Sequence, residues 1–238
     1  MLTIPLSEIQ AARQMIQPYI RKTPLLEFET LGLRCGKRIW LKCENLQNTG
    51  SFKIRGAANC ILSNLAQAKK NGVIAASAGN HAQGVAAICH SLGIKATIVM
   101  PTSTPTIKVA NTQNWGAKVE LVGNYYDESY EHAMALSKKD GLLFIHPFRD
   151  PKIMAGQGTL ALELAEDPCF QDLEAVVFAV GGGGLISGCG SALKSLRPDL
   201  KVYGVTAQNA PATWTSFHQN RAAEEDVHFT LAEGVAAK

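Results

Sequence analysis

The sequence predicts an α/β fold, built on mostly parallel sheets with helices on both faces. Short apolar runs alternate along the chain with longer segments of helical period, which is the order of βαβ units. The apolar runs are continuous rather than alternating, and this indicates strands that are covered on both sheet faces. A length of 238 residues, with 46% hydrophobic and 18% charged residues, is typical of one large or two small globular domains.

The elements follow from these runs in chain order. The runs that predict strands are residues 38–42, 72–76, 95–100, 117–122, 142–145, 175–180 and 201–205. The segments that predict helices are residues 7–19, 52–69, 80–92, 106–114, 127–138, 153–165 and 184–195. Strand and helix alternate without interruption from about residue 70 to 145, so this stretch is expected to form a compact unit. From about residue 207 onward the sequence is polar and irregular.

Composition excludes several classes of function. The formal net charge is +3 and the basic residues form no dense stripe, so a nucleic-acid partner is not expected. The cysteines contain no C-x-x-C pair, which argues against a zinc or redox motif and fits a reducing compartment. The chain shows no secretory signal and no apolar stretch of membrane-spanning length. We therefore expect a soluble, cytoplasmic protein with no membrane and no nucleic-acid partner.

Lys53 lies in a segment, residues 48–56, that follows a strand and opens a helix. Thr49 or Ser51 is expected to cap this helix, which places Lys53 in its first turn. The positive end of the helix dipole and nearby Arg55 both disfavour a charged amine there. A neutral amine is the form that attacks an aldehyde. The alternative is an ordinary surface lysine at a helix start, and the local pattern leaves both interpretations open.

A second segment, residues 76–84, joins an apolar strand to a helix through small and polar residues. Backbone N–H groups at such a helix start bind anions such as a carboxylate, and Asn80 and His81 add directional donors. The alternative is a plain strand–helix turn that Ser77 or Asn80 caps.

The third segment contains four consecutive glycines, Gly181 to Gly184, between a strand and a helix. Glycine lets the backbone approach a ligand closely, and N–H groups at the helix start can cradle a phosphate. No Gly-Lys-Ser/Thr follows and the spacing does not match G-x-G-x-x-G, so neither a Walker A loop nor a dinucleotide fingerprint is present. The glycines cost backbone entropy, so phosphate binding is favoured over a purely structural role.

An activated lysine, a phosphate cradle and a carboxylate-binding turn are together what pyridoxal phosphate needs to act on an amino acid. The sequence shows no cluster of metal ligands and no Ser/His/Asp arrangement that competes with this interpretation. The remaining histidines are isolated and are interpreted as core or surface residues: His90, His132, His146, His218 and His228.

These segments, in this order, resemble the fold-type II pyridoxal-phosphate enzymes, and most closely the threonine/serine dehydratase and serine racemase group. The motifs that carry the resemblance are Lys22-Thr-Pro24, Lys42-Cys-Glu-Asn45, residues 50–56, residues 77–84, Ala155-Gly-Gln-Gly-Thr159 and the tetraglycine loop. The resemblance implies a small domain, residues 66–144, inserted in a large one, residues 1–65 and 145–238. It also implies β-elimination of L-threonine or L-serine to a 2-oxo acid and ammonia, and a homo-oligomer, either dimer or tetramer.

The resemblance further implies a role for each site residue. Lys53 would carry the cofactor as a Schiff base and act as acid and base at the substrate α-carbon. Phe52 would pack on the pyridine ring and Asn80 would bind its hydroxyl group. The substrate carboxylate would bind Ser77, Ala78, Gly79, Asn80 and His81. The cofactor phosphate would bind Gly181, Gly182, Gly183, Gly184 and Leu185.

The sequence departs from that group in three places. Ala78 stands where serine racemases have a second serine, so little racemase activity is expected. Residues 206–212 contain no carboxylate where racemase-like members bind a divalent cation, so no metal site is expected. The chain stops just after Glu233-Gly-Val235, where the group continues with further strands of the large domain, so an unpaired apolar sheet edge is expected. Two alternatives stay open: another fold-type II lyase, or a shortened, catalytically silent protein that binds cofactor or subunits.

Overall fold

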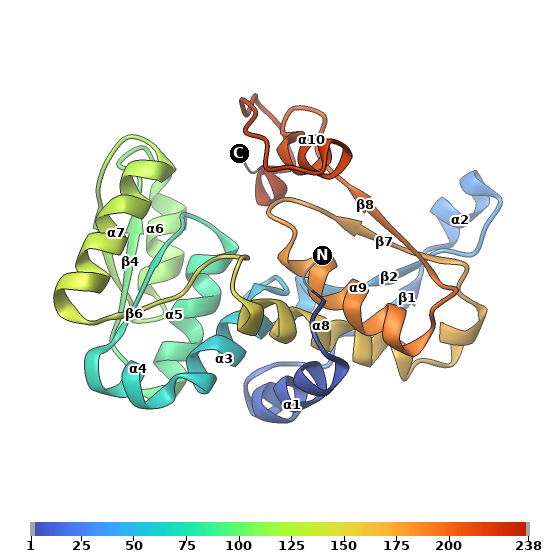
Figure 1. Cartoon of the computed structure of the whole chain (residues 1–238), viewed down its shortest axis with the longest axis horizontal. Helices are drawn as coiled ribbons and strands as arrows, with labels where there is room; N and C mark the ends of the chain where they lie inside the picture. The colour runs from blue at the N-terminus through green and yellow to red at the C-terminus, as the bar shows by residue number, and fades with distance from the viewer. Residues whose placement is uncertain (1–2, 237–238) are drawn as a thin grey trace.

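The computed structural model describes residues 3–236 (Figure 1). Its α-helices are α1 (Leu6–Ile16), α2 (Glu29–Cys35), α3 (Lys53–Ser63), α4 (Leu65–Asn71), α5 (Asn80–Leu92), α6 (Thr106–Gln113), α7 (Tyr126–Asp140), α8 (Pro151–Ala165), α9 (Gly184–Leu196) and α10 (Ala212–Gln219). Its strands are β1 (Leu25–Glu27), β2 (Trp40–Lys42), β3 (Val73–Ala76), β4 (Ala96–Met100), β5 (Lys118–Leu121), β6 (Leu143–Phe144), β7 (Ala175–Ala179) and β8 (Lys201–Val205). No helix in residues 3–236 is both long and apolar enough to cross a membrane.

A parallel four-stranded sheet with the order β5-β4-β3-β6 occupies one end of the molecule (Figure 1). Successive residues of its strands point to opposite faces. Ile74 and Val99 pack with Ala133 of α7 on one face, whereas Val73 and Ile98 pack with the helices α3 and α5 on the other. Both faces are therefore covered, as the continuous apolar runs predicted.

The other end of the molecule holds two smaller sheets, β7-β8 parallel and β1-β2 antiparallel. Phe178 and Val202 point inward onto the helices α8 and α9. Val177, Tyr203 and Val205 point the other way and are 63%, 51% and 55% exposed. Within residues 3–236, helices therefore cover only one face of the β7-β8 sheet.

Helices α3, α8 and α9 cross in the middle of the molecule and join its two ends (Figure 1). Glycines allow the close approach. A Cβ atom on Gly156 of α8 would lie 2.6 Å from Gly56 Cα of α3, and one on Gly188 of α9 would lie 2.8 Å from Gly158 N of α8. Since α3 begins at Lys53 and α9 begins at the last residue of the tetraglycine loop, this crossing fixes where two of the predicted site segments lie.

The structure corrects several sequence-based expectations about the elements. The single helix expected over residues 52–69 is split at Asn64, whose φ of −121° is not helical. The segment 7–19 is an α-helix only to Ile16 and then tightens into a 3₁₀ turn. The sequence pattern did not predict β1, α2 or α10. β1 and α2 have only three and seven residues, and α10 lies in the polar, irregular region from about residue 207 onward.

Candidate functional site

Lys53 is the first residue of α3, as expected, but its helix is not capped as expected. The residue before the helix is Phe52, and no side chain caps the N-terminus. Thr49 and Ser51 were expected to cap it; instead their hydroxyl groups are buried and, within the described residues, have no hydrogen-bond partner. The loop before the helix does not have the capping conformation that was expected, and its Gly50 lies in the left-handed region at φ 71°. Two unpaired hydroxyl groups next to Lys53 are what a polar ligand would satisfy.

The Lys53 amine is held at the junction of the two ends of the molecule. Its Nζ donates to the carbonyl oxygen of Pro147 at 3.1 Å and lies 5.5 Å from the centre of the Phe52 ring. Burial lowers the pKa of Lys53 from 10.5 to about 8. Burial favours the neutral amine, which is the form able to attack an aldehyde.

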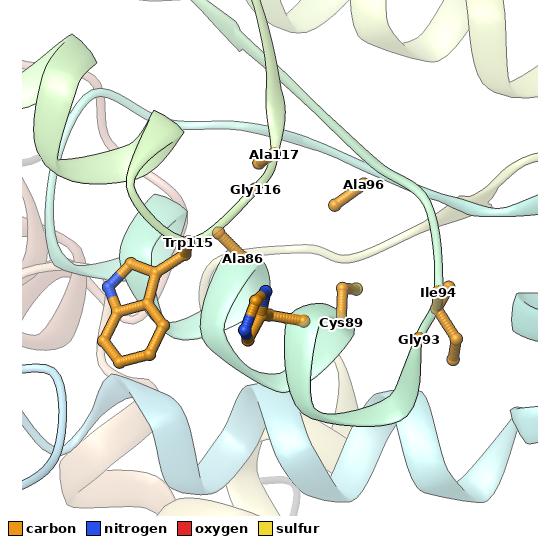
Figure 2. A pocket seen from close by; sticks show the side chains of 9 residues that line it. Ala86, Cys89, Gly93, Ile94, Ala96, Trp115, Gly116 and Ala117 are labelled. Atoms are coloured by element: carbon orange, nitrogen blue, oxygen red, sulfur yellow. The ribbon is translucent and has the colours of Figure 1, made fainter.

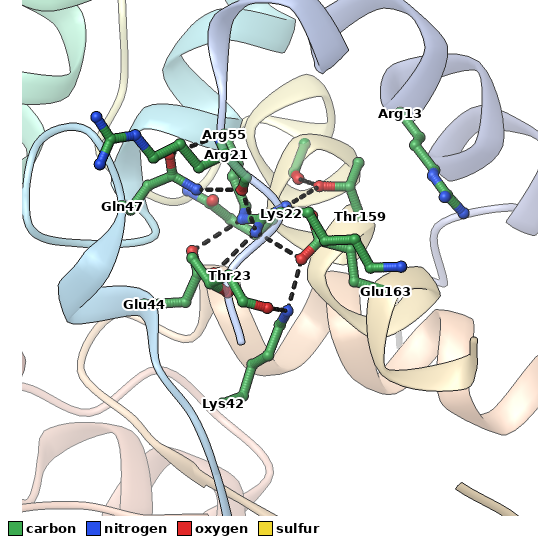
Figure 3. A network of polar contacts seen from close by, with 12 residues as sticks. Arg13, Arg21, Lys22, Thr23, Lys42, Glu44, Gln47, Arg55, Thr159 and Glu163 are labelled. Atoms are coloured by element: carbon green, nitrogen blue, oxygen red, sulfur yellow. Dashed lines mark hydrogen bonds and ion pairs between the residues drawn. The ribbon is translucent and has the colours of Figure 1, made fainter. Parts of the chain in front are cut away.

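Arg55 does not contribute to this shift, contrary to the expectation from sequence. Its side chain is fully buried and points away into a network of carboxylates (Figure 3). Arg55 Nε donates to Glu44 at 2.8 Å and Nη1 donates to Glu163 at 2.7 Å, while Lys42 Nζ lies 2.6 Å from the same Glu163. This network joins the β1-β2 region, α3 and α8, so it supports the helix that carries Lys53.

The turn before α5 presents backbone N–H groups at a helix start. Ser77 Oγ accepts a hydrogen bond from the N–H of Gly79 at 3.3 Å. The first N–H groups of α5, which begins at Asn80, have no helical acceptor. Asn80 is exposed, and a Cβ atom on Gly79 would meet nothing within 4 Å, so the turn faces open space.

His81 differs from its neighbours because its ring is buried inside the protein. Its Nε2 lies 3.0 Å from the carbonyl oxygen of Ile145. Burial, with a smaller effect from the charge of Lys53, lowers the pKa of His81 to about 3, so the ring is neutral at physiological pH. A carbonyl oxygen only accepts, so we assign the proton to Nε2. At this turn, the group of His81 that is available to an anion is therefore its backbone N–H and not a charged ring.

Gly183, the third glycine of the tetraglycine loop, has a φ of 83° that requires glycine, and the fourth, Gly184, is the first residue of α9. A Cβ atom on Gly182 would collide with the Phe148 ring, and one on Gly184 would lie only 3.0 Å from Phe148 Cβ. Leu185 is partly buried against the hydrophobic core that α8 and α9 form with the β7-β8 sheet. The unpaired N–H groups at the start of α9 form the donor set that a phosphate requires, so the loop fits the phosphate of pyridoxal phosphate.

Two neighbours of the site were not predicted from sequence. The segment Glu233–Val235 passes between the glycine loop and α5: a Cβ atom on Gly181 would lie 3.0 Å from Val235, and one on Gly234 would lie 3.8 Å from Asn80 Nδ2. The second is the connection after β6, residues 145–149, which contacts Lys53, His81 and the glycine loop. Its signal in the sequence is a histidine and a phenylalanine around a proline shortly after a strand, His146-Pro-Phe148.

A separate pocket of about 150 Å³ lies at the C-terminal end of α5 (Figure 2). It lies between the end of α5, the start of β4 and the loop before β5, with the Trp115 ring at one side. None of its lining residues belongs to the three site segments. In residues 3–236 there is also no group of three His, Cys, Asp or Glu side chains placed to hold a metal ion.

Comparison with known proteins identifies the family. The profile described as "Pyridoxal-phosphate dependent enzyme" matches residues 16–238. The chain belongs to this family. The family resemblance and the fold class that the sequence predicted are thus confirmed, and pyridoxal phosphate is the cofactor of the family to which the chain belongs.

Individual relatives are similar over nearly the whole chain. L-threonine ammonia-lyase of Thermotoga maritima is 48% identical over 235 residues, which are 99% of this chain but 58% of the relative. The processed form of threonine deaminase isoform 2 from Solanum lycopersicum superposes with a TM-score of 0.90 at 40% identity, covering 98% of this chain and 63% of that one. Maize serine racemase superposes with a TM-score of 0.94 at 30% identity, covering 99% of this chain and 71% of that one. The chain therefore spans little more than half the length of its Thermotoga relative.

Proposed function

We propose that this chain binds pyridoxal phosphate covalently, as a Schiff base on Lys53, and catalyses β-elimination on L-threonine or L-serine. One observation carries the proposal: a buried lysine amine of lowered pKa, the start of α5 and the glycine loop all contact the same connection, residues 145–149. Relatives named L-threonine ammonia-lyase and threonine deaminase support the choice of reaction.

Each site segment has a part in binding the cofactor. The N–H groups of Gly181 to Gly184 and of Leu185 would hold the phosphate at the start of α9. Phe52 would pack against the pyridine ring, and the exposed amide of Asn80 would bind the ring hydroxyl. When bound, the cofactor supplies an electron sink that accepts the negative charge developing at the substrate α-carbon.

The protein's own groups orient the substrate and move the proton. The turn of Ser77, Ala78, Gly79, Asn80 and His81 would bind the substrate carboxylate through its free N–H groups. The Lys53 amine, neutral in a substantial fraction of molecules near pH 8, takes the α-proton. The β-hydroxyl group leaves as water, and the released enamine hydrolyses to a 2-oxo acid and ammonia.

Ala78 sets a limit on the chemistry of this site. Its methyl group offers no acid or base on the side of the turn where a serine would offer a hydroxyl. Elimination should therefore exceed racemisation, even though serine racemases share the fold.

We further propose that residues 66–144 form the smaller domain and that residues 1–65 and 145–238 form the larger. All strands of the four-stranded sheet lie between Val73 and Phe144, which supports this division. We propose a homo-oligomer, because the described residues leave the apolar outer face of β7-β8 uncovered. We also propose a cytoplasmic location, since cysteines without a C-x-x-C pair fit a reducing compartment. The same uncovered face favours one alternative function, a catalytically silent chain that binds cofactor or subunits only.

The test uses purified chain with added pyridoxal phosphate. We expect a visible absorption band from the bound cofactor and formation of 2-oxobutanoate from L-threonine. Both should vanish in Lys53→Ala and persist in Lys70→Ala, which removes an exposed lysine of α4. A band without product would favour the silent alternative, and a folded chain with no band would contradict the cofactor assignment.

A further inference from the structure

The connection after β6, residues 145–149, is contacted by all three site segments. The carbonyl oxygen of Ile145 lies 3.0 Å from His81 Nε2, and that of Pro147 accepts from Lys53 Nζ at 3.1 Å. The ring of Phe148 packs directly against Gly182, so closely that a Cβ atom there would collide with it. The path of this connection therefore sets where the amine, the turn and the loop lie relative to one another.

His146 fixes that path. Its Nδ1 accepts two backbone hydrogen bonds, from the N–H of Phe148 at 3.1 Å and from the N–H of Arg149 at 3.0 Å. Its ring lies edge-on to the Phe148 ring, with 4.9 Å between the ring centres. Because one nitrogen accepts both N–H groups, the backbone around Pro147 is closed into a turn whose carbonyl faces Lys53.

We propose that His146 is a positioning residue of the site. Through the turn that it closes, it holds the Pro147 carbonyl against the Lys53 amine and the Phe148 ring against the glycine loop. The inference rests on the proposed function, in which Lys53 and the glycine loop bind the cofactor. The geometry of the turn itself can be measured without cofactor.

The role requires an unprotonated Nδ1, and the surroundings of the ring provide it. Burial is the largest cause that lowers the pKa of His146 to about 4; Arg149 and Lys53 lower it further, whereas Asp150 raises it. Above that pH the ring is neutral and Nδ1 accepts; protonation would make Nδ1 a donor and oppose both N–H groups. The titratable and charged groups around the ring are Lys53 of α3, His81 of α5, Tyr130 of α7, Arg149 and Asp150.

Two substitutions at this position separate the acceptor from the bulk of the side chain. In His146→Asn, the amide oxygen on Cγ takes about the place of Nδ1 and accepts the same N–H groups, whereas His146→Leu fills the space without an acceptor. His132→Leu is the matched control, since His132 of α7 pairs with Glu120 away from the site.

The first measurement is the pKa of Lys53 in cofactor-free chain. Trace acetylation at a series of pH values, with peptide mass analysis, reports how much of the Lys53 amine is neutral at each pH. We expect the pKa of Lys53 to rise from about 8 toward 10.5 in His146→Leu, because the opened turn admits water, and to stay near 8 in the other two variants. Affinity for pyridoxal phosphate should fall about tenfold in His146→Leu, as expected when buried N–H groups lose their acceptor, and recover in His146→Asn.

Several results would overturn the proposal. One is a folded His146→Leu chain in which the pKa of Lys53 is the same as in the unsubstituted chain. Another is a pKa of Lys53 that shifts equally in His146→Asn and His146→Leu. If His146→Leu does not fold, the ¹⁵N spectrum of the unsubstituted chain decides, because protonated Nδ1 at pH 7 would contradict the proposal and unprotonated Nδ1 would support it. If the unsubstituted chain fails to bind pyridoxal phosphate, the proposed function fails while the Lys53 titration still tests the turn.

Discussion

The close crossing of α8 and α9 makes a quantitative prediction about Gly188. An alanine there gains helix propensity of about 1 kcal/mol relative to glycine. However, its Cβ atom would lie 2.8 Å from Gly158 N and 2.9 Å from Met154 C, both backbone atoms of α8. The nearest atom of all is the backbone oxygen Met154 O, with which the Cβ atom would collide. Ordinary contacts exceed 3.4 Å, so α8 has to move by more than about 1 Å, and such overpacking costs about 3 kcal/mol or more.

Gly190 supplies the matched control on the same helix. A Cβ atom there meets only Val202 Cγ1 at 3.9 Å, which is ordinary van der Waals contact. Gly190→Ala should therefore raise the free energy of unfolding by up to about 1 kcal/mol, whereas Gly188→Ala should lower it by about 2 kcal/mol or more. Urea denaturation followed by circular dichroism measures both values. Equal effects of the two substitutions would refute the packing of α9 on α8, and with it the placement of the glycine loop.

Three other predictions concern the site and its support. At pH 7.5 about a quarter of the Lys53 side chains should be neutral if the pKa is about 8, against about one in a thousand if it is 10.5. Competitive acetylation of native and urea-unfolded chain measures the ratio of these two neutral fractions. Arg55→Met should destabilise the fold by about 3 kcal/mol in urea denaturation, because it leaves buried carboxylates uncompensated, and an unchanged midpoint would contradict the network in Figure 3. Gly182→Ala should displace the Phe148 ring and weaken pyridoxal phosphate binding by about tenfold or more, as titrated by absorbance; unaltered affinity would rule out this loop as the phosphate site.

The fold was predictable where the sequence pattern was long and regular. Strands such as Ala96–Met100 and helices such as Asn80–Leu92 lie almost where their apolar runs placed them. The three-residue strand Leu25–Glu27 shows no period of its own and exists because it pairs with residues 40–42. Such pairing is a tertiary contact and cannot be recognised in a single sequence.

The secondary structure around the candidate site was predictable from sequence, but the cause of the lowered pKa of Lys53 was not. The sequence placed Lys53 in the first turn of a helix, and the structure agrees. It attributed the neutral amine to the helix dipole and to Arg55, yet burial lowers the pKa and Arg55 points into a network of distant residues. His146 was interpreted as an isolated residue, because its partners are backbone N–H groups, which leave no mark in a residue pattern.

The most direct test of the central claim is the position of the cofactor on the chain. Purified chain is incubated with pyridoxal phosphate, reduced with sodium borohydride, digested and analysed by mass spectrometry. The reduced label should be found on the peptide that contains Lys53, and it should be lost in Lys53→Ala but not in Lys70→Ala. Label spread over exposed lysines, with Lys53 unmodified, would contradict the assignment of this site.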